Sequence, residues 1–431
     1  MNWPFPSRAI ALLGLGRTGR ALVEALSPLG LSLFLSEKRE LGPVERGFLS
    51  RHGVRWEEGG HSEAVLGCDL IVPSPGVPPH EPVLREAVRR GIPVVSELEV
   101  AWRMARPRCV IAVTGTNGKS TVTALIGRIL GAAGKDPVVA GNIGTPAIAT
   151  VREAEGRPWV LEVSSYQLEW TEEFRPDVAV FLNFAPDHLD HHGSLGAYLA
   201  AKARILRRQG RDDVAILPRE LLSRLSPRAR VVVYEGERLP PGWGPGLPPH
   251  LLLDLRAAWA AARAAFPDLT PPPYAAVEAA LRQPHRLEVV GEIRGIPFID
   301  DSKATNAHAT SAALRAVPGK CVLLLGGRHK GGGYEELRPL LGEKARLCVL
   351  FGESREFFAG LLSRWGIPFR EASSPEECLE LAYRAAHPGD WVLLSPACAS
   401  FDQFENYAHR GAVFREAFRA LSQRSGRMSR P

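Results

Sequence analysis

The apolar positions of the chain fall mainly in short runs, each followed by a glycine-rich or polar turn. Patterns with helical spacing separate the runs, so predicted strands and helices alternate along the chain. This alternation predicts parallel β-sheets covered by helices, an α/β fold. The runs are RAIALLGLG (8–16), LSLFLS (31–36), DLIV (69–72), PVVS (93–96), RCVIAVT (108–114), WVLEV (159–163), DVAVFLN (177–183), RVVVY (230–234), KCVLLLGG (320–327), RLCVLFG (346–352) and DWVLLS (390–395).

The runs form three groups, separated by proline-rich stretches. An Arg/Pro-rich stretch at 105–108 divides the first group from the second, and the Pro-rich stretch 270–286 precedes the third. A chain of 431 residues is too long for one ordinary hydrophobic core. We therefore predict three domains, residues 1–104, 105–286 and 287–431.

The composition is that of a globular protein, with 45% apolar and 23% charged residues. The net charge of +6 suits phosphate-bearing small molecules as well as RNA and decides nothing alone. The N-terminus shows no secretory pattern and no apolar stretch long enough to span a membrane. Six cysteines without CxxC spacing favour reduced core residues in a cytoplasmic protein. The last ten residues, SQRSGRMSRP, are predicted to be a frayed basic tail.

VTGTNGKST (113–121) is the strongest local signal for chemistry. A strand leads into a tight glycine loop, and GKS then opens a helix, which is the arrangement of a phosphate-binding loop. Lys119 is predicted to reach the outer phosphates of a nucleotide and Ser120 to ligate Mg²⁺. Val113 stands where the usual first glycine would fall, so the loop is shorter than the common form.

GLGRTG (14–19) also follows a strand and opens a helix, as in dinucleotide-binding folds. Glu37, at the end of the next strand, suits a ribose hydroxyl in an NAD enzyme. Because the chain also carries a phosphate loop, a nucleotide-linked substrate is at least as consistent with this motif.

Polar residues end two strands of the phosphate-loop segment. Glu162 closes WVLE, and Asp187 and His188 follow DVAVFLN. Ligands of parallel sheets bind beyond the carboxyl ends of the strands, so these side chains are candidates for a Mg²⁺ site. The run H-x-x-H-H at 188–192 would suit zinc, but no recurring Cys/His ligands accompany it.

The chain has only eight lysines against 45 arginines. Half of the lysines lie in suspected site motifs: Lys119, Lys202, Lys303 and Lys330. Lys202 is notable because all other basic residues of its predicted helix, YLAAKARILRRQGR (198–211), are arginines. A lysine can lose its proton and act as a nucleophile, whereas an arginine stays protonated.

Together these motifs resemble the Mur ligase family of peptidoglycan-building amide ligases, and in particular its D-glutamate-adding branch. The resemblance covers nearly the whole chain, and its amino-terminal GLG-type domain argues against the folylpolyglutamate synthase branch. The motifs that carry it are GLGRTG, SPGV (74–77), GTNGKST, GNIG (141–144), EVSSYQLE (162–169), DHLDHH (187–192), AAKARI (200–205), PHR (284–286), DSKATN (301–306), LLGG with Lys330, and SPACASFDQF (395–404).

The resemblance implies a three-domain α/β architecture: a Rossmann-like N-terminal domain, a central P-loop ATPase domain with a mainly parallel sheet, and a Rossmann-like C-terminal domain. It implies a reaction in which ATP phosphorylates the carboxylate of UDP-N-acetylmuramoyl-L-alanine and the amine of D-glutamate attacks the acyl phosphate. Two Mg²⁺ sites are implied, with Ser120, Glu162, His188 and Lys202 as ligands. Lys202 would carry a carbamate, and Lys119 and His188 would serve catalysis with it.

The resemblance also assigns binding residues to each substrate, with closure of the third domain onto the second near the PHR hinge. ATP would contact the loop, Arg286 and Asp301, with the loop residues being Gly115, Thr116, Asn117, Gly118, Lys119, Ser120 and Thr121. The UDP-linked substrate would contact Gly14, Arg17, Thr18, Ser36, Lys38, Gly76 and Asn142. D-glutamate would contact Lys303, Thr305, Lys330, Ser400 and Tyr407, where Tyr407 replaces the usual Phe.

Two stretches depart from the family pattern. SEK (36–38) lacks the usual leading acid, and HLLLD (250–254) lacks the His-Asn pair expected near adenine. Rival readings are a Mur-type ligase for another amino acid, a non-catalytic nucleotide-gated binding module, and an NAD oxidoreductase built on GLGRTG. We expect a monomeric protein that binds small molecules, without nucleic acid and without membrane insertion.

Overall fold

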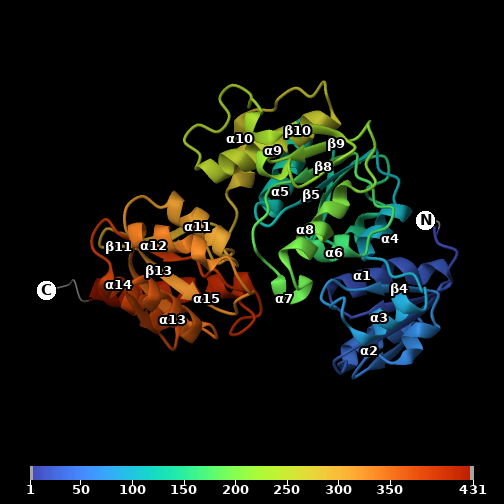
Figure 1. The fold of residues 1–431 in the computed structure, drawn as a ribbon, viewed down its shortest axis with the longest axis horizontal. Coiled ribbons are helices and arrows are strands. Elements are labelled where there is room, and N and C mark those ends of the chain that lie inside the picture. The colour runs from blue at the N-terminus through green and yellow to red at the C-terminus, as the bar shows by residue number, and fades with distance from the viewer. Residues whose placement is uncertain (1–2, 428–431) are drawn as a thin grey trace. The chain divides into compact units, whose positions relative to one another are not determined.

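The structure, a computed structural model, describes residues 3–427. It contains three sheets in an α/β arrangement, which confirms the predicted fold class (Figure 1). The chain forms two compact units. The first comprises the residues up to Phe184 with 193–245 and 252–280, and the second comprises 185–192, 246–251 and the residues from Leu281 onward.

The first sheet of the first unit has the strand order β3-β2-β1-β4, and all its pairs are parallel. The apolar runs at 8–16, 31–36 and 69–72 form three of its strands. The polar strand at 55–58 was not predicted, and the run PVVS (93–96) makes only an isolated bridge. Its strands are β1 (Ala9–Leu13), β2 (Ser32–Glu37), β3 (Arg55–Glu58) and β4 (Leu70–Pro73). The helices are α1 (Arg17–Leu26), α2 (Pro43–Arg51), α3 (Pro82–Arg89) and α4 (Glu97–Met104).

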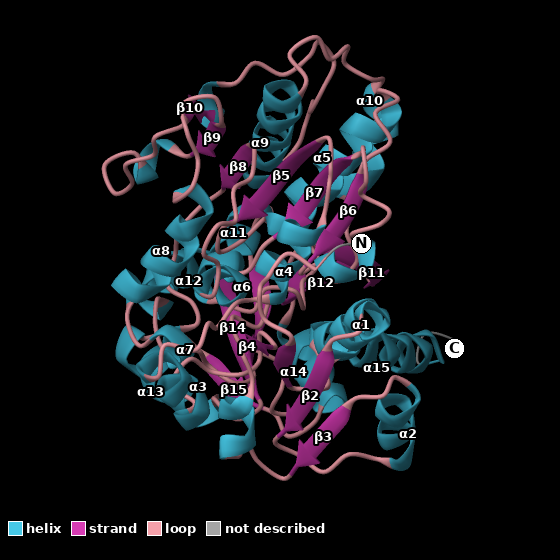
Figure 2. Cartoon of the chain, turned by 90° about the vertical axis from the view of Figure 1, so that its right-hand side faces the viewer, coloured by secondary structure: helices cyan, strands magenta, loops and turns pink. Residues whose placement is uncertain are grey.

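The second sheet of the same unit has the order β10-β9-β8-β5-β7-β6 and is also wholly parallel. Figure 2 shows β8, β5, β7 and β6 side by side in this order. The strands are β5 (Cys109–Thr114), β6 (Val138–Gly141), β7 (Pro158–Glu162), β8 (Val178–Phe181), β9 (Val214–Leu217) and β10 (Arg230–Val233). The helices along this part of the chain are α5 (Lys119–Ala132), α6 (Ser165–Glu169), α7 (Leu189–His192), α8 (Leu195–Ala203), α9 (Pro249–Ala265) and α10 (Tyr274–Glu278).

One hydrophobic cluster joins the two sheets of the first unit. It contains Leu12 of β1, Leu98 of α4, Trp159 of β7 and Ile148 from the turn between β6 and β7, all buried. Because apolar side chains from both sheets share this cluster, the first unit holds two sheets on a common core.

The sheet of the second unit has the order β11-β12-β16-β13-β14-β15; its β11–β12 pair is antiparallel and the others are parallel. Alternate residues of β13 enter different cores, since Leu323 and Leu325 lie in one cluster and Val322 and Leu324 in another. Both faces of the sheet are therefore covered. Its strands are β11 (Glu288–Ile293), β12 (Ile296–Asp300), β13 (Cys321–Gly326), β14 (Ala345–Phe351), β15 (Phe369–Glu371) and β16 (Trp391–Leu394). Its helices are α11 (Ala307–Ala316), α12 (Leu337–Lys344), α13 (Arg355–Trp365), α14 (Pro375–Ala385) and α15 (Tyr407–Arg427).

The frayed tail predicted for 422–431 is wrong for its first part, because α15 continues to Arg427; residues 428–431 lie outside the described residues. The apolar residues Phe414, Phe418 and Leu421 bury one side of α15 in the core, which supports the helix along its length. The predicted domain bounds 1–104, 105–286 and 287–431 stay a prediction.

All six cysteines are free thiols, as expected, and five of them are buried. Burial raises the pKa of Cys109 and of Cys398 to about 11. No helix among residues 3–427 is long and apolar enough to cross a membrane.

Candidate active site

The loop between β5 and α5 has the backbone shape of a phosphate-binding loop. β5 ends at Thr114 and α5 begins at Lys119, so residues 115–118 lead directly into a helix N-terminus, where main-chain N–H groups attract anions. Gly118 has a φ of 85°, and a Cβ atom there would lie 2.6 Å from a carboxylate oxygen of Asp254. Only glycine fits this position without strain.

Lys119 and Asn183 fix the shape of this loop. The Lys119 ammonium donates to the carbonyl oxygens of Gly115 (2.9 Å) and Thr116 (2.8 Å). The main-chain oxygen of Asn183 accepts from the Thr116 N–H at 3.0 Å, and its side chain accepts from the Asn117 N–H at 2.9 Å. Asn183 was not among the predicted site residues, although a polar residue ending the run DVAVFLN was a usable signal.

Glu162 lies at the end of β7, whose register pairs it with Val113 of β5. Its side chain is 2% exposed; Oε1 accepts from the Asn142 amide at 2.8 Å, and Oε2 has no hydrogen-bond partner among the described residues. A buried carboxylate oxygen without a partner is costly unless a cation approaches it. Glu162 and the hydroxyl of Ser120 are oxygen ligands of the type that Mg²⁺ prefers, so the residues fit the predicted metal.

Lys202 of α8 lies against the phosphate loop. Its side chain is 1% exposed, and Nζ donates to the carbonyl oxygen of Gly115 at 2.7 Å. The same nitrogen lies 4.7 Å from the centre of the Tyr198 ring, and the Tyr198 hydroxyl meets that of Thr116 at 3.4 Å. The lysine that the sequence singles out is thus a buried neighbour of the loop and not a solvated surface residue.

A cleft of about 720 Å³ opens in the first unit between loops of its two sheets. A hydrogen bond connects the two walls of the cleft. Arg17, at the start of α1, donates to the carbonyl oxygen of Gly144, which follows β6, at 2.9 Å. Six of the seven predicted contacts of the UDP-linked substrate line this cleft: Gly14, Arg17, Thr18, Lys38, Gly76 and Asn142. His61 and Gln167 also line it and were missed by the sequence analysis.

Ser36 is not among the residues that line the cleft, and its predicted contact with the substrate stays a prediction. It is fully buried, donates to Glu57 at 2.6 Å and lies 2.7 Å from His61 Nδ1. Ser36 thus contacts His61, a residue that lines the cleft. Glu37 also lines the cleft, and its carboxylate accepts from the N–H of Leu15 at 2.7 Å, which holds the GLGRTG loop.

In the second unit, Asp187 contacts Lys330, which is predicted to bind D-glutamate, and His188, a predicted metal ligand. It accepts from Lys330 Nζ at 3.1 Å, from the Asn306 amide at 2.9 Å and from the His188 N–H at 2.9 Å. Lys330 also lies 3.4 Å from the Thr305 hydroxyl. Burial by itself raises the pKa of Asp187, but the charge of Lys330 and the Asn306 hydrogen bond outweigh it and hold the pKa at about 2.

The remaining predicted amino-acid contacts lie on loops of the same unit. Lys303 donates to Gln283 at 3.0 Å, and its ammonium lies 5.7 Å from the centre of the Tyr407 ring. Ser400 is 2% exposed, and its carbonyl oxygen accepts from the Phe404 N–H at 2.9 Å. Lys303, Tyr407 and Ser400 follow β12 or β16, neighbouring strands of one sheet.

Asp301 and Arg286, predicted to contact ATP, also belong to the second unit. Burial raises the pKa of Asp301 to about 7, against the opposing effects of the Ser395 hydroxyl and the Arg286 charge. Burial and the charge of Arg286 lower the pKa of His250 to about 4. His250 and Leu251 of the HLLLD stretch lie in the second unit, and Asp254 lies in the first, beside Gly118.

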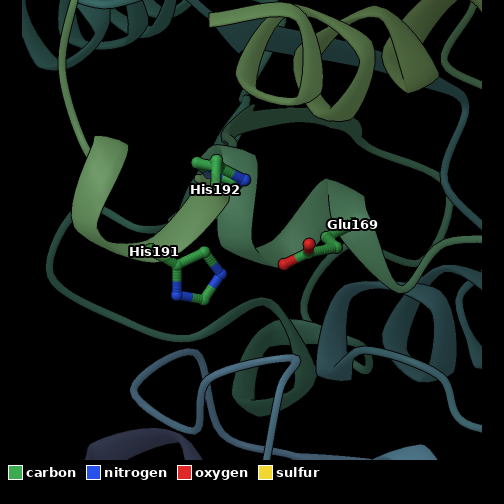
Figure 3. Close-up of side chains that lie close together, drawn as sticks. All are labelled: Glu169, His191 and His192. Carbon is green, nitrogen blue, oxygen red and sulfur yellow. The ribbon is translucent and has the colours of Figure 1, made fainter. Parts of the chain in front are cut away.

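The histidine run at 188–192 has a spacing that would suit zinc. Figure 3 shows His191 and His192 on α7 and Glu169 on α6. Glu169 belongs to the first unit and the histidines to the second, and within either unit alone the described residues form no group of three such ligands.

The first unit combines parallel sheets with a phosphate loop, a buried lysine beside that loop and a large cleft. These are the features of a nucleotide-using enzyme. The chain belongs to the Mur ligase family. Residues 113–233 match the Mur ligase middle domain, residues 9–83 the MurD N-terminal domain, and residues 285–398 the Mur ligase glutamate ligase domain.

Similar proteins support this assignment over the full length. The chain is 39% identical to the UDP-N-acetylmuramoylalanine–D-glutamate ligase of Acidobacterium capsulatum over 95% of either chain. It is 38% identical to the ligase of the same name from Syntrophus aciditrophicus, over 95% of this chain and 97% of that one.

Solved structures show the same fold. The MurF ligase of Thermotoga maritima in complex with ADP has a TM-score of 0.59 at 16% identity, over 96% of this chain and 95% of that one. The UDP-N-acetylmuramate–alanine ligase MurC of Thermotoga maritima has a TM-score of 0.56 at 20% identity, over 96% of this chain and 99% of that one.

Proposed function

We propose that the protein catalyses the ATP-dependent ligation of D-glutamate to UDP-N-acetylmuramoyl-L-alanine, a step of peptidoglycan precursor synthesis, and works in the cytoplasm as a monomer. Full-length similarity to curated ligases named for this activity is the observation that carries the proposal. The arrangement of charged groups in each unit supports it.

In the first step the substrate carboxylate attacks the γ-phosphoryl group of ATP, giving an acyl phosphate and ADP. Residues 115–121 cradle the phosphates with main-chain N–H groups at the start of α5, and Lys119 exchanges its loop carbonyls for phosphate oxygens. The substrate's UDP end occupies the cleft lined by Gly14, Lys38 and Asn142.

Mg²⁺ would be held by Ser120 and Glu162 and, in a second site, by His188 and Lys202, and when bound it neutralises phosphate oxygens and the charge of the transferred group. Lys202 reaches this role as a carbamate, formed from the neutral amine and CO₂. Forming the carbamate releases a proton, and the carbamate keeps one N–H to donate to Gly115. Arginine cannot form this group.

In the second step the amine of D-glutamate attacks the acyl phosphate, and the tetrahedral intermediate expels phosphate. Lys303 and Lys330 bind the two carboxylates of D-glutamate, with Thr305, Ser400 and Tyr407 as further contacts. Asp187 keeps its negative charge at neutral pH and holds the Lys330 ammonium in place before the amino acid arrives. Arg286 and Asp301 contact ATP from the second unit.

The test is phosphate release from ATP with UDP-N-acetylmuramoyl-L-alanine, comparing D-glutamate, L-glutamate and meso-diaminopimelate. We expect release and a mass-confirmed amide only with D-glutamate. Amide formation with another amino acid would replace the assigned specificity, and tight ATP binding without any release would favour a nucleotide-gated binding module.

A further inference from the structure

Arg410 of α15 is a buried cation that the proposed reaction does not use. It is 2% exposed, among the largest fully buried side chains of the described residues. Burial lowers the pKa of its guanidinium to about 10, so the group stays charged at neutral pH. Burying a charge is costly unless its hydrogen bonds do something that an apolar side chain cannot.

All hydrogen bonds of this guanidinium go to main-chain carbonyl oxygens on two loops. Nη1 donates to Cys398 at 3.0 Å and to Ala399 at 3.3 Å, and Nη2 donates to Ser302 at 2.7 Å. Nε has no partner among the described residues. The nearby carboxylates of Asp300, Asp301 and Asp402 act on Arg410 through charge alone.

The two loops carry the residues assigned to D-glutamate. Ser302 directly precedes Lys303, which follows β12, and Ala399 directly precedes Ser400, which follows β16. One planar group thus joins the main chain immediately before two predicted substrate contacts. The five donors of a guanidinium lie in a fixed fork, which a lysine ammonium cannot reproduce.

Glycines around Arg410 make room for this arrangement. A Cβ atom at Gly327 would lie 2.3 Å from the Ala399 oxygen and 3.2 Å from Arg410 Nη1. A Cβ atom at Gly411 would lie 2.6 Å from the Ser302 hydroxyl. The loop that follows β13 is tied in as well, since Arg328 and Ala399 exchange main-chain hydrogen bonds of 3.0 and 2.9 Å.

We propose that Arg410 is a positioning residue for the amino-acid substrate: it sets the spacing of the loops that carry Lys303 and Ser400, and so the affinity for D-glutamate. This inference rests on the proposed function, because it takes these two residues as substrate contacts. Arg410 acts through the loops, and the predicted contacts of the UDP-linked substrate, which all lie in the first unit, are outside the loops it holds.

The experiment measures KM for each of the three substrates in Arg410→Met and Arg410→Lys. Both variants are expected to raise KM for D-glutamate at least about tenfold, since each loses hydrogen bonds from a charged donor. KM for the UDP-linked substrate should stay within about twofold. KM for ATP should rise less than KM for D-glutamate, because ATP keeps the phosphate loop of the first unit besides Asp301 and Arg286. Arg419→Met, an exposed position on α15, is the matched control and should keep all three values.

Gly327→Ala is the second variant, because it displaces the Ala399 carbonyl without removing the guanidinium. It should also raise KM for D-glutamate selectively, which keeps the test sharp if Arg410→Met folds poorly. Nucleotide affinity and the melting temperature report whether each variant is folded.

Three outcomes overturn the inference. An unchanged KM for D-glutamate in folded variants removes the role, and a normal KM in Arg410→Lys would show that charge and not geometry matters. A parallel rise of all three KM values with a lowered melting temperature would mean a purely structural residue. If the wild-type protein ligates no D-glutamate, the proposed function itself is wrong. The wild-type reaction shows this before any variant is tested.

Discussion

At the scale of single residues, burial distinguishes Lys202 from a solvated lysine on the surface of a helix. Its amine contacts Gly115 of the phosphate loop and the ring of Tyr198, and solvent has almost no access to it. An arginine of the same charge would bring a planar group that cannot be converted into a carboxylate.

We predict that Lys202→Arg lowers kcat/KM at least about a hundredfold, because a metal ligand is worth several kcal/mol in the transition state. ATP binding should remain, since Lys119 and the loop N–H groups are untouched. The measurement is steady-state phosphate release, with and without a short carboxylic acid as a rescuing agent. Lys320→Arg, at an exposed lysine, is the control. Wild-type activity of Lys202→Arg would exclude the carbamate.

At the scale of elements, the phosphate loop depends on the backbone of Gly118, where β5 is connected to α5. Gly118→Ala should weaken ATP binding at least about tenfold and cost about 1–3 kcal/mol of stability, because the positive φ and the Asp254 contact both oppose a Cβ atom. Isothermal titration with a non-hydrolysable ATP analogue measures the affinity. Gly131→Ala, in the last turns of α5 with nothing nearer than 3.9 Å, should bind normally. Equal affinity in both variants would contradict this account of the loop.

A second element-scale feature is the contact of α4 with the segment around Ile148 and with α6. Glu97 of α4 is 1% exposed and accepts from the Ile148 N–H at 2.6 Å. Burial raises the pKa of Glu97 to about 7, although the hydrogen bonds from Ile148 and Gln167 oppose this. Gln167 also lines the cleft, so Glu97 supports one wall of the substrate site.

The raised pKa of Glu97 makes stability depend on pH. Between the ordinary glutamate pKa of about 4.3 and about 7, the native state keeps this proton and the unfolded chain releases it. The free energy of unfolding therefore falls as pH rises through this window and levels off above it, by about 1.4 kcal/mol per pH unit for one proton. Asp301, whose pKa is also about 7, contributes with the same sign.

The Glu97→Gln variant should lack the contribution of the Glu97 proton to the pH dependence of the free energy of unfolding. Urea unfolding at several pH values between 5 and 8 measures it, with Glu24→Gln on the exposed side of α1 as control. An unaltered slope in Glu97→Gln would show that Glu97 is ionised throughout.

At the scale of the whole molecule, the predicted contacts of the substrates divide between the two units. The phosphate loop and the cleft belong to the first, and Lys303 and Lys330 belong to the second. The acyl phosphate and the attacking amine must meet with water excluded, so we expect the chain to close around its ligands.

Small-angle scattering should show a smaller radius of gyration with an ATP analogue, UDP-N-acetylmuramoyl-L-alanine and D-glutamate together. The UDP-linked substrate alone should cause little change, because its proposed cleft lies wholly within the first unit. Identical curves with and without the full set of ligands would count against closure.

The sequence predicted the fold class and ten of the sixteen described strands, because buried parallel strands are continuous apolar runs. It missed short or partly exposed strands such as β3 and β15, and the run PVVS (93–96) forms only an isolated bridge. The lysines stood out because they are rare in this chain. The sequence analysis missed residues whose roles depend on contacts with distant parts of the chain. Asn183 and Arg410 act by holding main-chain groups of distant loops, and no local pattern encodes such contacts.

The six free thiols have a practical consequence for following this closure. A raised pKa leaves almost no thiolate at neutral pH, and the thiolate is the form that maleimide dyes attack. The native cysteines can therefore stay in place while one new surface cysteine is introduced into each unit. Energy transfer between two dyes attached there would report the distance between the units molecule by molecule during turnover.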